Sequence, residues 1–401
     1  MTRTTPPPEH FARMEAALAD AVLNQRPVAV LDASALRANL KDLTRRAAST
    51  PIRLASKSIR VRELQRRILD HDGFQGTLCF TLPEALFLSS HGFTDLVIAY
   101  PTADGPALRQ LAGDAEARAA ITLMVDDEAH LDLMDALAPN HPAFRIALDL
   151  DTAYRPVKQV WIGSARSPIR TPQDLTRLAS TVVRRRGYRL VGMMAYEGQI
   201  AGVGNAGRGP RATMVRAMQA RSAQELRARR AEAVAAVSRL GALEFVNGGG
   251  TGSLESTSAE EAVTEVAAGS GVFGPGLFDH YRHFSPQHAL HFGLDVVRRP
   301  APGIATVLGG GWVASGAPGQ DRLPTVAWPH GLSYRGTEGA GEVQTPLVGE
   351  SADTLKVGDV VWMRHAKAGE LCERVNEIVV VEDGTVSDVL PTYRGEGKAF
   401  L

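Results

Sequence analysis

The chain has 401 residues, 44% of them hydrophobic and 22% charged, an ordinary composition for a globular protein with room for two domains. Lys plus Arg equals Asp plus Glu at 44 each, so no net charge favours nucleic acid or an anionic membrane as a partner. The polar, proline-rich start and the lack of a run of about 18 apolar residues predict neither a secretory signal nor a membrane span. The two cysteines, Cys79 and Cys372, lie far apart, which fits a reducing cytoplasm better than a disulfide framework.

Strand-like apolar segments alternate with helical segments through most of the chain. This alternation favours parallel strands joined by crossover helices, and strands that are apolar along their whole length are expected to be covered on both faces. Eight such units predict a (β/α)8 barrel rather than an open doubly wound sheet. The predicted strands are 28–32, 52–56, 76–80, 95–100, 121–126, 144–150, 188–196 and 243–249, and the clearest helices are 34–48, 83–92, 171–185 and 214–240.

A change of pattern after about residue 290 marks a second domain. Helical periodicity gives way to short strands and turns, including an EDGT sequence typical of a tight hairpin. We therefore predict an α/β fold in which a TIM barrel is followed by a C-terminal all-β domain. The expected division is an N-terminal extension over 1–24 that packs on the β-domain, a barrel over 25–288 and a β-domain over 289–401.

Candidate functional residues follow the ends of the predicted strands, where TIM barrels build their active sites. Lys57, in RLASKSIR, ends the second predicted strand. An amine at that place either reaches water or is held ready to form a Schiff base. The polar residues after the sixth and seventh predicted strands are Asp149, Asp151, Arg155, Tyr196, Glu197 and Gln199.

Two glycine-rich segments come late in the predicted barrel. NGGGTGS (247–253) follows the eighth predicted strand, and GSGVFGPG (269–276) comes soon after it. Consecutive glycines let backbone N–H groups turn towards an anion, although glycine-rich turns are also common for structural reasons alone. Neither segment is a Walker loop, because no Gly-Lys-Ser/Thr ending follows. A strand-end lysine with a late phosphate-binding loop predicts pyridoxal 5′-phosphate as cofactor, with Lys57 holding its aldehyde.

The sequence resembles the fold-type III pyridoxal phosphate enzymes, in which an alanine racemase-like barrel is followed by a β-domain. Within them it is most similar to the D-threonine aldolase and D-serine dehydratase branch, which includes proteins called amino acid deaminase/aldolase. The resemblance spans roughly residues 25–390. It rests on the order and spacing of RLASKSIR, GTLCFTLPEALFLSSHGFTDLVIAYP, LVGMMAYEGQ, NGGGTGS, GEVQTPL and RHAKAGELCERVNE.

The resemblance implies roles for individual residues. Lys57 is similar to the Schiff-base lysine of the family, and Tyr196 in YEG to the aromatic residue that lines the cofactor. Arg155 is similar to the arginine near the phenolic oxygen of the cofactor. The residues that match the phosphate loop are Gly249, Gly250, Thr251 and Gly252, with Gly271 and Val272 as further backbone donors.

The same branch binds a divalent metal (Zn, Mn or Mg) in its β-domain, commonly through His-x-Cys or His-x-Asp. Here His365 is followed by Ala-Lys, and Cys372 comes seven residues after it. Either a short insertion separates two metal ligands, His365 and Cys372, or Lys367 replaces the second ligand and the site is lost, because an ammonium must lose its proton to ligate. Glu370 is a third candidate, and a buried apolar role for Cys372 is the alternative.

Several other residues bear on the chemistry. Gln199 stands where many relatives carry histidine, and Phe273 where a tyrosine is frequent, which leaves the acid–base assignment open. Arg166, in SARSPIR, is a candidate for binding a substrate carboxylate, with a solvated charge as the alternative. Four histidines cluster in DHYRHFSPQHALHF, where we expect an interdomain surface segment, because their spacing matches no common metal-ligand pattern. They are His280, His283, His288 and His291.

Together these inferences predict a lyase that acts on β-hydroxy D-amino acids. We expect retro-aldol cleavage to glycine and an aldehyde, with Lys57 and Tyr196 as catalytic residues and a metal near His365 that binds the β-hydroxyl. One alternative is a D-serine dehydratase-like deaminase that yields a keto acid and ammonia. Another is an amino acid racemase with Tyr334 or Tyr393 as the second base, and a third is a non-catalytic vitamin-B6-binding protein. The expected partner is a small amino acid, with a homodimer as the assembly and without nucleic acid or membrane.

Overall fold

The structure is a computed structural model that describes residues 6–23 and 25–401. The chain forms two compact units, and each is described by itself. The barrel unit comprises Leu43–Lys57, Arg67–Gly269 and Phe400–Leu401. The sheet unit comprises the described residues up to Asp42, together with Ser58–Arg66 and Ser270–Ala399.

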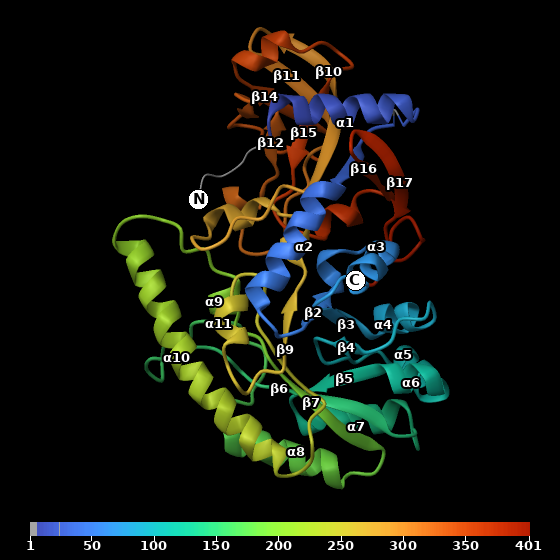
Figure 1. Cartoon of the computed structure of the whole chain (residues 1–401), viewed down its shortest axis with the longest axis vertical. Coiled ribbons are helices and arrows are strands. Elements are labelled where there is room, and N and C mark those ends of the chain that lie inside the picture. Colours follow the sequence, from blue (N-terminus) through green and yellow to red (C-terminus); the bar gives the residue numbers. More distant parts are fainter. Residues whose placement is uncertain (1–5, 24) are drawn as a thin grey trace. The chain divides into compact units, whose positions relative to one another are not determined.

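Eight parallel strands close into a barrel in the barrel unit (Figure 1). Each strand pairs with the next, and β9 returns to β2, where Ile52 lies opposite Val266. A TIM barrel followed by an all-β domain is thereby confirmed as the fold class. The barrel strands are β2 (Ile52–Ala55), β3 (Phe74–Cys79), β4 (Leu96–Ile98), β5 (Ile121–Val125), β6 (Phe144–Asp149), β7 (Tyr188–Ala195), β8 (Phe245–Gly248) and β9 (Glu265–Ala268).

Helices join the barrel strands. Helix α8 begins at the predicted signal: the Thr171 hydroxyl accepts a hydrogen bond from the Asp174 backbone N–H at 3.1 Å, and Pro172 opens the first turn. The helices of this part of the chain are α2 (Ala33–Ala47), α3 (Arg62–Leu69), α4 (Leu82–Ser89), α5 (Gly105–Gly113), α6 (Ala115–Ala120), α7 (Glu128–Leu137), α8 (Pro172–Arg184), α9 (Gly198–Ala201), α10 (Pro210–Ser238) and α11 (Leu254–Ser258). The division between the two units falls within α2 and α3.

Apolar side chains fill the interior of the barrel. They are Val97, Ala99, Met124, Ala147, Val191, Met194 and Phe245. Alternate residues of a strand share a face, so the residue two positions beyond an inward-facing one also faces inward. By this rule Asp126, Asp149 and Tyr196 form the next inward-facing layer, at the C-terminal ends of β5, β6 and β7. The chain thus places two carboxyl groups and a phenol where a TIM barrel builds its active site.

A nine-stranded sheet forms the second unit. Seven strands follow the order β13-β14-β11-β10-β1-β16-β17, and β15 pairs with both β10 and β12. The strands are β1 (Val28–Asp32), β10 (Leu290–Ala301), β11 (Ile304–Leu308), β12 (Thr325–Trp328), β13 (Ser333–Tyr334), β14 (Gln344–Val348), β15 (Val360–Arg364), β16 (Glu377–Glu382) and β17 (Thr385–Pro391). Its 3-10 turns are η2 (Ser270–Val272), η3 (Gly276–His280), η4 (Gln320–Arg322), η5 (Glu350–Thr354) and η6 (Glu370–Glu373).

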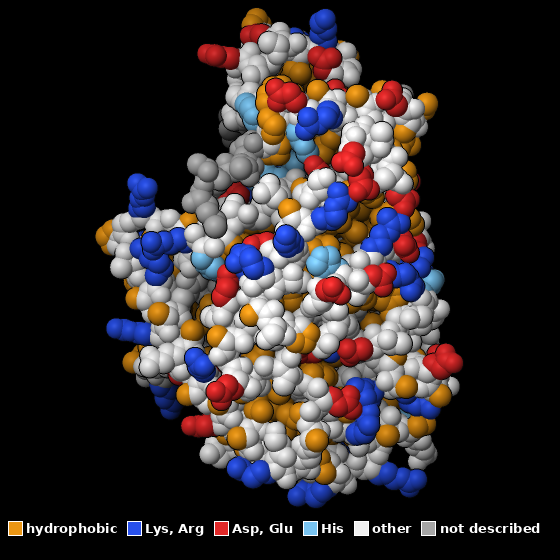
Figure 2. Space-filling view, in the orientation of Figure 1, with side chains coloured by type: hydrophobic (Ala, Val, Ile, Leu, Met, Phe, Trp, Pro, Cys, Tyr) orange, Lys and Arg blue, Asp and Glu red, His pale blue; other side chains and the backbone are white. Residues whose placement is uncertain are grey.

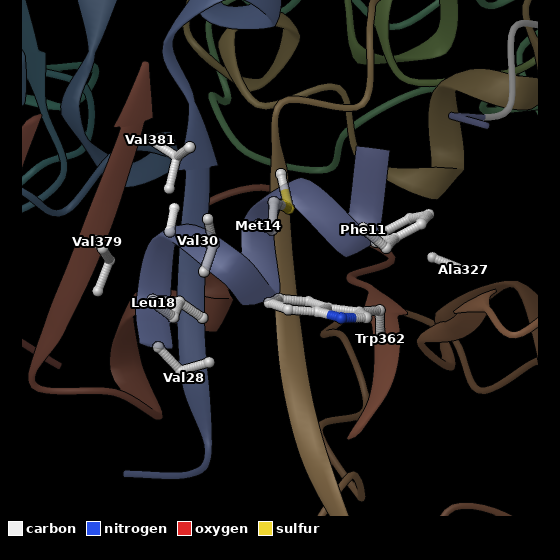
Figure 3. Close-up of a cluster of buried hydrophobic side chains, with 10 residues drawn as sticks. Phe11, Met14, Leu18, Val28, Val30, Ala327, Trp362, Val379 and Val381 are labelled. Atoms are coloured by element: carbon white, nitrogen blue, oxygen red, sulfur yellow. The ribbon is translucent and has the colours of Figure 1, made fainter. Parts of the chain in front are cut away.

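Helix α1 (Pro8–Asp20) covers part of this sheet, and Figure 3 shows its apolar face against the strands. Phe11, Met14 and Leu18 are buried there, at helical spacing. The Trp362 indole N–H also donates to the Glu15 carboxylate at 2.8 Å. The strand and loop residues of this cluster are Val28, Val30, Ala327, Trp362, Val379 and Val381.

The structure corrects the predicted strand order. Residues 28–32 do not open the barrel: as β1 they pair antiparallel with β10 and parallel with β16. The eighth barrel strand is instead β9, a four-residue strand that the sequence analysis missed. A strand at the centre of a helix-covered sheet is buried on both faces, as a barrel strand is, so the two give the same apolar signature. The expected division at 25–288 and 289–401 therefore differs from the two units, because the sheet unit takes 28–32 from before the barrel.

No helix among the described residues is long and apolar enough to cross a membrane. Figure 2 shows acidic and basic side chains interspersed over the face in view, as expected from their equal numbers.

Candidate active site

Lys57 lies directly after β2, on the 3-10 turn η1 (Ser56–Ser58). The Ser56 hydroxyl donates to the Leu78 carbonyl on the neighbouring strand β3 at 3.1 Å, which fixes the start of this turn. The Lys57 amine lies 3.0 Å from the hydroxyl of Tyr100, which follows β4. The lysine is half-buried. It is therefore held beside a phenol at the end of the barrel, as a Schiff-base lysine would be.

Two tyrosine rings and one arginine surround this position. The Arg166 guanidinium carbon lies 5.3 Å from the centre of the Tyr100 ring and 5.5 Å from the centre of the Tyr196 ring. Burial raises the pKa of Tyr196 to about 12, while the charge of Arg166 opposes this shift. Tyr196 therefore keeps its proton near neutral pH, and its hydroxyl is able to donate a hydrogen bond.

Glu197 organises the chain beside the glycine loop. Its buried carboxylate accepts hydrogen bonds from the Gly249 backbone N–H at 3.1 Å and the Ser253 hydroxyl at 2.8 Å. The Thr257 hydroxyl and the buried Arg230 guanidinium also donate to it. A carboxylate that accepts this many hydrogen bonds is well compensated for its burial. Glu197 thus ties the end of β7 to the loop that follows β8.

The glycine loop itself takes a conformation that needs glycine. Gly249 has a φ of +79°, and a Cβ at Gly250 would lie 3.0 Å from the Ala201 Cβ. The Gly249 and Gly250 N–H groups already donate to Glu197 and Ser253, so they shape the loop. From the other side, Arg46 donates to the Thr251 carbonyl at 2.7 Å. The role of Gly249, Gly250, Thr251 and Gly252 as donors to a phosphate stays a prediction.

Gly271 and Val272 lie in η2, directly after β9, and belong to the sheet unit. There the Val272 carbonyl accepts a hydrogen bond from the Asn39 amide at 2.9 Å. Their role as further phosphate donors stays a prediction.

Arg155 occupies a different place from Arg166. Its guanidinium donates to the Asp151 carboxylate at 2.9 Å and stacks on the exposed Trp161 ring at 3.5 Å. Among the residues that the structure describes, these are the contacts it makes, and neither Lys57 nor Tyr196 is among them. Its assignment to the phenolic oxygen of the cofactor stays a prediction.

Two carboxyl groups share the inward-facing layer with Tyr196. Burial, and next the charge of Asp126, raise the pKa of Asp149 well above its usual value. Burial also raises the pKa of Asp126, which lies 3.4 Å from the His130 ring. In the described part of the chain, the Asp149 carboxyl has neither a hydrogen bond nor an ion pair. Burial therefore disfavours the charged form of both carboxyl groups.

Gln199 and Phe273 are the two residues that differ from those often found in the related branch. Gln199 is buried and donates to the Thr152 carbonyl at 2.6 Å and to the Ser222 hydroxyl at 2.9 Å. Phe273 is fully buried in the sheet unit. Gln199 therefore serves as a structural hydrogen-bonding residue.

The predicted metal ligands lie in the sheet unit. His365 follows β15 and is buried, with its Nδ1 3.2 Å from the Leu290 carbonyl and its Nε2 without a hydrogen-bond partner. Burial lowers the pKa of His365 to about 3, so its imidazole is neutral, as a ligand requires. Cys372 is buried in η6, where burial raises the pKa of its thiol to about 12. That thiol does not ionise by itself at neutral pH, as binding through sulfur requires.

Lys367 and Glu370 have partners of their own. The Lys367 ammonium lies 3.2 Å from the Glu370 carboxylate, and both contact Ser315. Within residues 6–23 and 25–401, no three His, Cys, Asp or Glu side chains are placed to hold a metal. The divalent metal stays a prediction.

The histidine-rich segment differs from the prediction. His280 and His283 are exposed, as a surface segment requires. His291, however, lies on β10 and is fully buried, so its placement on the surface is wrong. Its ring packs beside His10 and His288, with ring centres 5.8 and 6.2 Å apart. The alternation of β10 carries His291 into the interior of the sheet unit, which the spacing of the histidines does not reveal.

Sequence reasoning missed Tyr100 and undervalued Arg166. Both lie in segments that follow barrel strands, and Tyr100 ends the predicted strand 95–100. A polar aromatic residue at a strand end was the available signal for Tyr100. For Arg166 there was none, because 16 residues lie between Arg166 and the end of β6 at Asp149.

Comparison with known proteins agrees with this geometry. Residues 31–276, more than half of the chain, match the family described as alanine racemase, N-terminal domain. A 3-hydroxy-D-aspartate aldolase of Paracoccus denitrificans is 25% identical over 389 residues, covering 93% of each chain. A D-threonine aldolase of an Arthrobacter species is 25% identical over 369 residues, covering 90% of each chain.

Solved structures share the fold. A D-threonine aldolase from Filomicrobium marinum superposes with a TM-score of 0.76 at 21% identity, covering 92% of this chain and 95% of the other. A D-threo-3-hydroxyaspartate dehydratase from a Delftia species has a TM-score of 0.72 at 20% identity, covering 92% and 97%. These matches confirm the resemblance inferred from the motifs. The chain therefore belongs to the alanine racemase N-terminal domain family of fold-type III, pyridoxal-phosphate-dependent enzymes.

Proposed function

We propose that this lyase cleaves β-hydroxy D-amino acids to glycine and an aldehyde at the C-terminal end of the barrel. The observation that carries the proposal is the Lys57 amine, 3.0 Å from the Tyr100 hydroxyl at the end of β2. The relatives include aldolases of D-threonine and of 3-hydroxy-D-aspartate, which supports a β-hydroxy D-amino acid as substrate.

The residues at the barrel end fit pyridoxal phosphate. Lys57 would supply the amine that holds the aldehyde, and the loop with Thr251 and Gly252, which would hold the phosphate, follows the barrel strand β8. A Cβ at Gly250 would also come within 3.2 Å of the Tyr196 ring, so only glycine leaves the tyrosine face clear beside the loop. Bound there, the cofactor supplies an electron sink for the electrons released at Cα.

Three side chains, Lys57, Tyr100 and Tyr196, would have different roles in the proton transfers. Lys57 would hold the cofactor, and its amine, once released by the substrate, would be available as a base. The hydroxyl of Tyr100 lies within hydrogen-bond distance of that amine and orients it. Tyr196, whose pKa burial raises to about 12, keeps its proton and is not a base near neutral pH. Cleavage requires the β-hydroxyl proton to leave and Cα to gain one.

Dehydration is the second candidate, because the same parts serve elimination of the β-hydroxyl. The support is the fold shared with a D-threo-3-hydroxyaspartate dehydratase. Racemisation is less well supported, although alanine racemases share the fold too, because both tyrosines that would act as the second base have other partners. The Tyr393 hydroxyl accepts a hydrogen bond from Gln65 at 2.7 Å, and the Tyr334 hydroxyl donates to the Pro324 carbonyl at 2.7 Å. Both candidate second bases are thus engaged inside the sheet unit.

The test combines absorbance with product analysis. Protein supplied with pyridoxal phosphate should absorb near 420 nm and lose this band on borohydride reduction, and K57A should show no such band. Incubation with D-threonine or 3-hydroxy-D-aspartate should yield glycine and the corresponding aldehyde. A keto acid with ammonia would favour the dehydratase, and an L-isomer would contradict both candidates. Exposed Lys158 offers a control, since K158A should retain the band.

A further inference from the structure

Arg166 is an exposed arginine at the barrel end that has no carboxylate partner among the described residues. Its guanidinium lies over two tyrosine rings, but in the described part of the chain it makes neither a hydrogen bond nor an ion pair. Arg155, by contrast, is bound to Asp151 at 2.9 Å. A guanidinium offers a fork of donors that matches a carboxylate, so an unpaired one beside a reactive amine suits an anionic ligand.

The segment that carries Arg166 is fixed to the barrel. The Ser167 hydroxyl donates to the Asp149 carbonyl at the end of β6 at 2.7 Å. Ile169 accepts from the Asp151 N–H at 2.7 Å, and Ile162 exchanges two backbone hydrogen bonds with Tyr154. Residues on both sides of Arg166 are therefore held by hydrogen bonds, so less backbone entropy is lost when Arg166 binds a ligand.

Arg166 and Lys57 approach the same tyrosine. The Lys57 amine lies 5.5 Å from the centre of the Tyr100 ring, and the Arg166 guanidinium carbon lies 5.3 Å from it. A substrate whose amino group replaces the lysine on the cofactor would bring the rest of its short chain near this arginine. A carboxylate at the far end of that chain would give Arg166 the partner it lacks.

We propose that Arg166 binds a distal carboxylate of the substrate, so that the site prefers acidic β-hydroxy D-amino acids such as 3-hydroxy-D-aspartate. This inference rests on the proposed function and narrows its substrate class. In the cleavage, the β-hydroxyl proton leaves, the Cα–Cβ bond breaks and Cα gains a proton. The products are glycine and glyoxylate, which keeps the distal carboxylate.

The neighbouring carboxyl groups support this role. Asp149 faces Asp126, Asp151 and Arg166, and burial together with Asp126 raises its pKa. Because these shifts disfavour the charged form of Asp149, its carboxyl competes less with a ligand for the charge of Arg166. As the pH rises and Asp149 ionises, it should repel the distal carboxylate, so KM for 3-hydroxy-D-aspartate should increase. D149N should remove that increase. Its KM for 3-hydroxy-D-aspartate should then vary with pH as weakly as we expect KM for D-threonine to vary.

Kinetics of R166Q test the proposal. The loss of a charged hydrogen-bonding partner should lower kcat/KM for 3-hydroxy-D-aspartate about tenfold to a hundredfold more than kcat/KM for D-threonine. R166K should fall between the wild type and R166Q. The matched control is R177Q, because exposed Arg177 pairs only with Asp174 on the outside of α8. Equal losses for both substrates, or no loss, would overturn the proposal.

A binding measurement separates this inference from the proposed function. Titration calorimetry on protein loaded with pyridoxal phosphate compares D-aspartate with D-2-aminobutyrate, which carries a methyl group in place of the distal carboxylate. Wild-type protein should bind D-aspartate at least tenfold more tightly, and R166Q should lose that preference. If neither hydroxy amino acid is cleaved but this preference is found, the proposed reaction fails and the role of Arg166 stands. Equal affinities in wild-type protein would refute the role of Arg166.

Discussion

Glu197 shows how one residue can determine the shape of a loop that is distant in sequence. It directly follows Tyr196, and its carboxylate joins the Gly249 backbone, Ser253 and Arg230. Arg230 lies on α10 and is itself fully buried, with Glu260 as its second partner. The glycine loop is thus shaped by an ion-pair network rather than by its glycines alone.

Removing the charge of Glu197 should damage both stability and cofactor binding. E197Q leaves the buried Arg230 with a single carboxylate, so we expect a loss of about 3 kcal/mol in the free energy of unfolding, measured by urea denaturation. The affinity for pyridoxal phosphate should fall as the loop loosens. The control is E244Q, whose surface pairs with Arg145 and Arg189 should contribute less than about 1 kcal/mol. Similar stability losses in the two variants would contradict the importance of burial.

The sequence predicts some residues of this site and not others, for a physical reason. Lys57, Tyr196 and the glycine loop each follow a recognisable strand, so the barrel rule alone places them at one end. Arg166 lies within a long connection, and only the fixed path of that connection brings it to the tyrosine rings. No periodicity encodes such a path.

At the scale of whole elements, helix α1 contributes the largest apolar side chain to the sheet cluster from outside the sheet. Phe11 is fully buried and stacks near Trp328 and Trp362, with ring centres 6.4 and 6.0 Å away. We expect F11A to lower the free energy of unfolding by about 3–5 kcal/mol, since it removes a buried ring and leaves a cavity. The exposed neighbour Arg13 provides the comparison, because R13A should change stability by less than about 0.5 kcal/mol. Chemical denaturation followed by tryptophan fluorescence measures both.

The exchange of β1 for β9 shows what a strand pattern can and cannot predict. The apolar run 28–32 identifies a strand buried on both faces, and this is correct. It does not identify the partner strands, because pairing depends on residues far away, such as His291 and Val379 opposite Val30. The short β9, only four residues, is below the length at which an apolar run stands out. Eight barrel strands were therefore predicted with one member wrong.

For the molecule as a whole, the buried histidines predict a loss of stability in acid. Burial lowers the pKa of His288 to about 4 and that of His291 well below its usual value. In the unfolded chain both should titrate near about 6.5. Protons therefore bind the unfolded state first as the pH falls below that value, and the free energy of unfolding decreases towards pH 4.

Denaturation measured across this pH range tests the effect. For His291 alone we expect a cost on the order of 2 kcal/mol at pH 5, relative to neutral pH. H291L should flatten the decline, whereas H283N, which changes an exposed histidine, should leave its slope unchanged. The raised pKa of Asp149 acts in the opposite direction, since it favours the folded state as the pH falls. If the free energy of unfolding falls as steeply in H291L as in the wild type, groups other than His291 cause the loss of stability in acid.

The place of β1 in the sheet also matters for protein synthesis. This strand leaves the ribosome early, yet its neighbours on either side, β10 and β16, emerge only after the last barrel strand. In the nascent polypeptide it has two bare edges, which makes it a site for chaperone capture or for mispairing with another molecule. Termination of translation after Ala301 but before Glu377 would yield a product with every barrel strand and with β10, but with the β16 side of β1 left open.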